Sequence, residues 1–215
     1  MLRDMPSHNL YTVLMVISLL AVAIAKGMAP LRFNEFISVI GNSKYLKIYS
    51  KAQKFFDVYD GLLFLNLIIS LAVFYFLAIK TFTGISVFNL ASTLKLVLII
   101  GVFILAKVLL ERLIASLFEI DTMIDYYLFQ KICYKNYFGL FLLPINTILI
   151  FSITPTKTII YSVLTLLFIV NISGLTTTFK VYQNEIKHNL FYFILYLCAL
   201  EIAPFIIVGS FLVPN

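Results

Sequence analysis

Long runs of apolar residues recur from one end of this 215-residue chain to the other. At a rise of about 1.5 Å per residue, most of these runs are long enough to cross a hydrocarbon core of about 30 Å as an α-helix. The pattern therefore predicts an all-α fold, a polytopic membrane helix bundle with about six transmembrane spans in one domain. We place these spans near residues 10–29, 61–79, 96–118, 137–153, 158–175 and 190–213.

The connection between the first two spans, residues 31–60, has a different pattern. Apolar and aromatic residues such as Tyr45, Ile48 and Tyr49 fall on one helical face, and lysines fill the adjacent arc. This is typical of amphipathic interfacial helices whose lysines reach anionic lipid headgroups. An anchor that orients the protein is the simpler interpretation, and a lipid-sensing or partner-docking element is the alternative. The lysines are Lys44, Lys47, Lys51 and Lys54.

The composition excludes a soluble protein. Hydrophobic residues make up 62% of the chain, charged residues 12%, and the mean hydropathy is +1.03. A soluble domain is about half apolar and about a quarter charged. The net charge of +6 comes from basic residues in the connections, so no solvated basic domain is present for nucleic acid. The two cysteines, Cys133 and Cys198, have no metal or redox spacing, and we expect no metal and no cofactor.

The distribution of Lys and Arg predicts the orientation. Ten lie in the connections after the first, third and fifth spans, and four lie on the opposite side. Because positively charged loops stay in the cytoplasm, we expect both termini to be extracytoplasmic. Ala23-Ile24-Ala25 would also fit a signal-peptide cleavage site. We expect the first run to be retained, since cleavage would leave the basic residues 26–54 on the extracytoplasmic side.

Charged and amide side chains inside the predicted spans are the candidates for function. A charge near the bilayer centre costs a few kcal/mol, so it usually faces a partner or a cavity. Lys107 lies at the middle of the third predicted span and Glu201 near the middle of the last, and we predict that they pair. The candidate residues together form a predicted intramembrane polar seam: Lys107, Glu111, Arg112, Glu201, Asn146 and Asn171.

An alternative concerns the third span alone. If this span begins earlier, near Ser92, then Glu111 and Arg112 simply mark its cytoplasmic end.

Three functions compete for such a seam: joining helices or partners, carrying ions or protons, and catalysis. Catalysis has little support, because His8 and His188 lie in separate segments and no H-E-x-x-H, G-x-S-x-G or Gly-rich phosphate motif occurs. We therefore expect no catalytic residue and a non-enzymatic membrane subunit or scaffold of a cell-envelope complex. The alternative is a small ion- or proton-coupled transporter that uses Glu201 and Lys107.

A family resemblance runs along nearly the whole chain. Residues 196–204 read YLCALEIAP, and further pieces lie in the same order: Arg32-Phe33, Lys44-Tyr45, Lys107 with Glu111, and Phe129-Gln130-Lys131. In these pieces the chain resembles an uncharacterised family of Bacteroidota inner-membrane proteins, a domain of unknown function with a C-terminal YLCxLExxP-type signature. The resemblance implies a small polytopic fold in the bacterial inner membrane. It implies no activity. Separately, we expect the lipid bilayer and a protein partner in the membrane to be the contacts of this chain.

Overall fold

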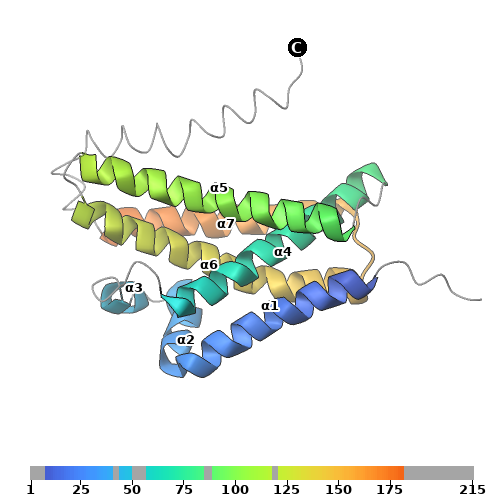
Figure 1. Cartoon of the computed structure of the whole chain (residues 1–215), viewed down its shortest axis with the longest axis horizontal. Coiled ribbons are helices and arrows are strands. Elements are labelled where there is room, and N and C mark those ends of the chain that lie inside the picture. The colour runs from blue at the N-terminus through green and yellow to red at the C-terminus, as the bar shows by residue number, and fades with distance from the viewer. Residues whose placement is uncertain (1–7, 41–43, 50–56, 85–88, 118–120, 182–215) are drawn as a thin grey trace, which may run out of the picture.

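The computed structural model describes residues 8–40, 44–49, 57–84, 89–117 and 121–181. These residues form helices, and no strand occurs among them (Figure 1). The elements in chain order are α1 (His8–Met28), α2 (Pro30–Ile37), the 3₁₀ turn η1 (Ser38–Ile40), α3 (Lys44–Tyr49), α4 (Val58–Thr83), α5 (Leu90–Leu117), α6 (Asp121–Phe151) and α7 (Lys157–Val181).

Three of the described helices are long and apolar enough to cross a membrane. They are α1 from Leu10 to Met28, α4 and α5, and α7 adds a shorter apolar stretch, Lys157–Ile169. The all-α helix bundle is therefore confirmed for the described residues, and the three helices that could cross a membrane support a membrane protein. Six spans stay a prediction, and the last of them, residues 190–213, lies outside the described residues.

Helix α4 is the central element of the bundle. It packs most extensively against α6 and α1, and 61% of its most apolar stretch is buried, compared with 11% for α5. Its ends follow from local sequence. The Asp57 side chain accepts a hydrogen bond from the backbone N–H of Tyr59, which caps the first turn. Gly84, at φ 72°, adopts the left-handed conformation that ends many helices.

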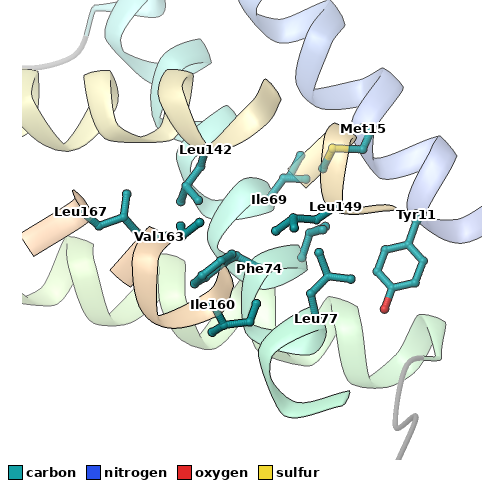
Figure 2. Close-up of a cluster of buried hydrophobic side chains, with 11 residues drawn as sticks. Tyr11, Met15, Ile69, Phe74, Leu77, Leu142, Leu149, Ile160, Val163 and Leu167 are labelled. Carbon is teal, nitrogen blue, oxygen red and sulfur yellow. The ribbon is translucent and has the colours of Figure 1, made fainter. Parts of the chain in front are cut away.

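The main apolar core lies where α1, α4, α6 and α7 meet. Figure 2 shows side chains from these four helices converging, with Tyr11 and Met15 on α1 facing residues of α4 and α6. A second apolar cluster lies where α1 ends and α4 begins, and α2 and α3 lie at this same end (Figure 1). We call this end of the bundle the Arg32 end, after Arg32 of α2.

Helices α4 and α6 run in the same direction and approach each other closely at Gly139. A Cβ atom at this position would lie 2.5 Å from the Cα of Leu67. Small residues allow such backbone approaches between membrane helices, which maximises van der Waals contact. The glycine is thus required by the packing of α4 on α6, the most extensive interface among the described helices.

The observed boundaries revise several predicted ones. Helix α6 is continuous from Asp121, so the segment that leads into the predicted span 137–153 is part of the same helix. Helix α5 begins at Leu90, before the predicted residue 96, so its centre falls near Phe103 instead of Lys107. This start favours the alternative in which Glu111 and Arg112 mark one end of the span.

The amphipathic segment is helical at α2 and α3, but part of its apolar face is used inside the protein. Tyr45, on the predicted apolar face, is only 1% exposed, and Phe33 and Phe36 are buried as well. Ile48 does remain exposed. Lys44 and Lys47 lie in α3, and Lys51 and Lys54 lie outside the described residues.

Candidate functional site

The Arg32 end holds a largely buried arginine between two carboxylates. Arg32, on α2, pairs through Nη1 with Asp57 and through Nη2 with Asp60 Oδ2 at 2.9 Å. Asp57 caps α4 and Asp60 lies in its first turn, so the arginine joins α2 to the start of α4. Its side chain is 14% exposed. A charge buried to this degree is stable only when it is paired and hydrogen-bonded, which this one is.

Aromatic rings enclose the rest of the guanidinium. Its carbon lies 4.3 Å from the ring centroid of Tyr59 and 5.2 Å from that of Tyr49, which are cation–π distances. Its Nε donates a hydrogen bond to the Tyr45 hydroxyl at 3.2 Å. Burial disfavours the charged form, but Asp60, Tyr45 and Asp57 together outweigh burial and raise the pKa of Arg32. The arginine is therefore a permanent cation that ties α2 and α3 to α4.

Stacked and edge-to-face rings extend this cluster to α6. The ring centroids of Phe36 and Tyr45 lie 5.6 Å apart, and Tyr45 stacks on Phe129 of α6 at 6.1 Å. Phe36 also meets Tyr137 at 5.9 Å. Such pairs contribute about 0.5–1.5 kcal/mol each beyond the area they bury. They dock α2 and α3 against the bundle.

A second ion pair, between a fully buried glutamate and a largely buried lysine, joins α5 to α6. Lys131 Nζ donates to Glu111 Oε1 at 2.5 Å; Glu111 is fully buried and the Lys131 side chain is 13% exposed. The ammonium also lies 5.5 Å from the ring centroid of Tyr127. Arg112, which follows Glu111 in the chain, lies 3.7 Å from Asp125 in a more exposed position. Both pairs fasten the α5–α6 hairpin.

Several buried polar atoms at the Arg32 end have no hydrogen-bond partner among the described residues. Asn136 donates to the backbone carbonyl of Asp60 at 3.4 Å, but its own carbonyl oxygen accepts nothing. Gln130 is 1% exposed and neither end of its amide is bonded. The other two atoms are Glu111 Oε2 and the Tyr59 hydroxyl. Buried groups of this kind are usually satisfied by ordered water.

A separate polar cluster lies at the centre of the bundle and joins α1, α4 and α6. The Ser18 hydroxyl donates to Asn66 Oδ1 at 2.5 Å, and the Ser70 hydroxyl donates to the same oxygen at 3.4 Å. Asn146 Nδ2 donates to the backbone carbonyl of Ser70 at 2.8 Å. All four side chains are fully buried. Hydrogen bonds of this kind hold membrane helices together.

The predicted seam residues thus fall into different places. Glu111 bonds to Lys131, and Asn146 belongs to the central cluster, about 22 Å further along α6 at 1.5 Å per residue. Lys107 is half-buried on α5. Glu201 lies outside the described residues, and Asn171 lies in α7 with a side chain that is not described.

Sequence reasoning missed the roles of Arg32, Asp57, Asp60, Lys131 and Gln130. The sequence patterns used Arg32 and Lys131 in the orientation count and in the family resemblance, and neither use gave them a structural role. The one local signal was the Asp57 cap immediately before an apolar run. The arginine's carboxylate partners lie 25 and 28 residues further along the chain, which no local pattern indicates.

Comparison with known proteins agrees with the resemblance in part. A family model described as a domain of unknown function (DUF4271) matches residues 11–212. The Bacteroidota origin and the C-terminal signature stay predictions. Neither a curated protein nor a solved structure matches the chain. Among the described residues, no group of three His, Cys, Asp or Glu side chains is placed to hold a metal ion.

Proposed function

We propose that this chain, which belongs to the DUF4271 family, is a non-enzymatic integral membrane subunit or scaffold of a cell-envelope complex. It acts in the bacterial inner membrane, with both termini extracytoplasmic and the Arg32 end at the cytoplasmic face. The headgroups of anionic lipids and a protein partner in the membrane are its contacts.

One observation carries this proposal: buried charges in the described part of the chain are bonded to other groups of the same chain. Arg32 is held by two carboxylates, and Glu111 is held by Lys131. Removing one member of a buried pair is costly because the other is left without compensation. Charges used in this way fasten helices, and they suit a rigid bundle better than a hydrated substrate path.

Helix α5 is the surface that we assign to the partner. Its apolar residues are exposed on much of its circumference, since only 11% of its most apolar stretch is buried. Lipid covers such a surface without penalty, but a partner helix gains close packing there. The exposed large residues include Leu94, Leu98, Ile99, Val102, Phe103, Leu105, Leu109, Leu110 and Leu113.

Site-specific photo-crosslinking in the native membrane tests the proposal. A photoreactive residue at Val102 or Phe103 of α5 should give one protein adduct of defined mass. The same residue at Leu19 of α1, which is similarly exposed, is the matched control and should give lipid adducts only. Co-expression of two differently tagged copies distinguishes a second copy from another protein. The absence of protein adducts from every α5 position would refute the scaffold.

The second candidate, a small ion- or proton-coupled transporter, draws support from the buried polar atoms that have no partner among the described residues. Glu111 Oε2 is one of them. In this function Glu201 and Lys107 carry the ion. Proton flux into proteoliposomes that disappears in Glu201→Gln and Lys107→Met would favour the transporter over the scaffold.

A further inference from the structure

In the central polar cluster, one donor atom and one acceptor atom have no hydrogen-bond partner among the described residues. Asn66 accepts two hydroxyl groups at its carbonyl oxygen, but its Nδ2 has no acceptor among the described residues. Asn146 donates its Nδ2 to the Ser70 carbonyl, but its Oδ1 accepts nothing there. Both amides are fully buried. Each is bonded to Ser70, the first to its hydroxyl and the second to its backbone, so they face the same small region.

The depth of this cluster makes unused groups expensive. Ser18 lies next to the middle of the span Leu10–Met28, and Ser70 lies at the middle of Val58–Thr83. The hydrocarbon region around these positions offers no solvent, so an unsatisfied polar group is strongly destabilising there. A ligand that accepts from Asn66 and donates to Asn146 would remove both penalties.

We infer that one water molecule is bound at this site, between Asn66 of α4 and Asn146 of α6. It accepts a hydrogen bond from Asn66 Nδ2 and donates one to Asn146 Oδ1. Its second hydrogen is donated to a lone pair of Ser18 or Ser70. Three bonds are the usual number for a buried water.

The chemistry of the site favours water over a cation. A sodium ion would satisfy the oxygen of Asn146 but leave the N–H of Asn66 without an acceptor. The Asn146 amide is fixed by its bond to the Ser70 carbonyl, which only its NH₂ group can make. If the Asn66 amide turns over, the unused groups become two oxygens, and one water donates to both. Water therefore fits with either orientation of Asn66.

Hydroxyl-radical footprinting of the full chain in lipid nanodiscs tests this inference, because radicals formed from a bound water modify the side chains beside it. Met15 is a built-in reporter: it lies one turn before Ser18, is buried, and its sulfur lies 3.9 Å from the Thr147 hydroxyl, next to Asn146. We expect Met15 to be modified despite its burial. Asn66→Leu and Asn146→Leu should each abolish this modification.

Gln130→Leu is the matched control, since it replaces a buried amide at the Arg32 end and should leave Met15 labelling unchanged. An unmodified Met15 in the wild type would overturn the inference. So would labelling that persists in both leucine variants, because the radicals would then come from elsewhere. Should the leucine variants not fold, an experimental structure that resolves water decides: density between the two amides supports the site, and a direct bond between them refutes it.

Discussion

Gly139 offers the sharpest test of the packing. Gly139→Ala adds a Cβ atom 2.5 Å from Leu67 Cα, 2.8 Å from its Cβ and 3.0 Å from its backbone nitrogen. Non-bonded carbon atoms normally lie about 3.5–4.0 Å apart, so the two backbones must separate by about 1 Å. No side chain can absorb this change by turning, because two of the three clashing atoms belong to the backbone.

Gly139→Ala should lower the free energy of unfolding by more than the steric clash alone, because hydrogen bonds between α4 and α6 are weakened as well. Overpacking of this kind costs about 1–3 kcal/mol. The same displacement would stretch two bonds between α4 and α6, the one from Asn146 to the Ser70 carbonyl at 2.8 Å and the one from Asn136 to the Asp60 carbonyl at 3.4 Å. A hydrogen bond lengthened by about 1 Å no longer counts as one. We therefore expect the loss to lie at the upper end of that range.

Two other glycines calibrate the result. Gly61, in the first turn of α4, has nothing within 4 Å of an added Cβ. Gly61→Ala should be neutral or slightly stabilising, because alanine favours a helix by up to about 1 kcal/mol over glycine. A Cβ at Gly101 would meet only the Cδ1 of Ile68, at 3.2 Å, and this flexible side chain can move. Gly101→Ala should therefore fall between the other two.

Thermal unfolding in mild detergent measures the series. A thiol-reactive dye can report it through Cys133, which is buried, in a Cys198→Ser background. We expect Gly61→Ala to have the highest melting temperature, Gly101→Ala an intermediate one and Gly139→Ala the lowest. If Gly139→Ala has the same melting temperature as Gly61→Ala, the close approach of α4 and α6 is refuted.

Four further predictions follow from the ion pairs and the orientation. Arg32→Met should destabilise the protein by about 3–5 kcal/mol by the same assay, because it leaves Asp60 without its ion-pair partner. Arg32→Lys should recover little of this stability, because an ammonium cannot bond to both carboxylates as the planar guanidinium does. Glu111→Gln and Lys131→Met should each lower the melting temperature while the double variant regains part of the loss; strictly additive losses would contradict the pair. Glu201→Gln and Lys107→Met should behave in the same way if those residues pair, and a sum of independent effects would deny it. Cysteines at Pro214 and Ser50 should label from the extracytoplasmic and cytoplasmic sides respectively, and cytoplasmic labelling at Pro214 alone would reverse the predicted topology.

The presence of a helix was predictable where one apolar run stood alone, but the residues at which it begins and ends were not. The run that became α4 was recognised at residues 61–79, and the helix extends to Val58–Thr83 because the Asp57 cap and Gly84 lie beyond the apolar part. The third span was predicted to begin at residue 96, directly after Lys95, whereas α5 begins at Leu90. A helix backbone continues through an exposed lysine near a membrane surface, where the side chain can reach water.

The environment of an apolar face was not predictable. Tyr45 and Phe36 have the spacing of a face that meets lipid, and they are buried against α4 and α6 instead. Hydrophobic periodicity says that a face avoids water. It cannot distinguish lipid from the protein's own core, because both are apolar.

The sequence by itself determined that this chain is a helical membrane protein, because the length and hydrophobicity of a run are local properties set by the thickness of the bilayer. It also marked buried polar residues such as Glu111 and Asn146 as exceptions that need partners. Only the tertiary structure decided which partners they have. Glu111 bonds to Lys131 across a hairpin, and Arg32 bonds to Asp60 at the start of α4, 28 residues later in the chain. Asn146 bonds to Ser70, which is 76 residues away in the chain. Pairing of this kind depends on how helices cross and on where a glycine allows two backbones to approach each other. The residue pattern of a single segment determines neither.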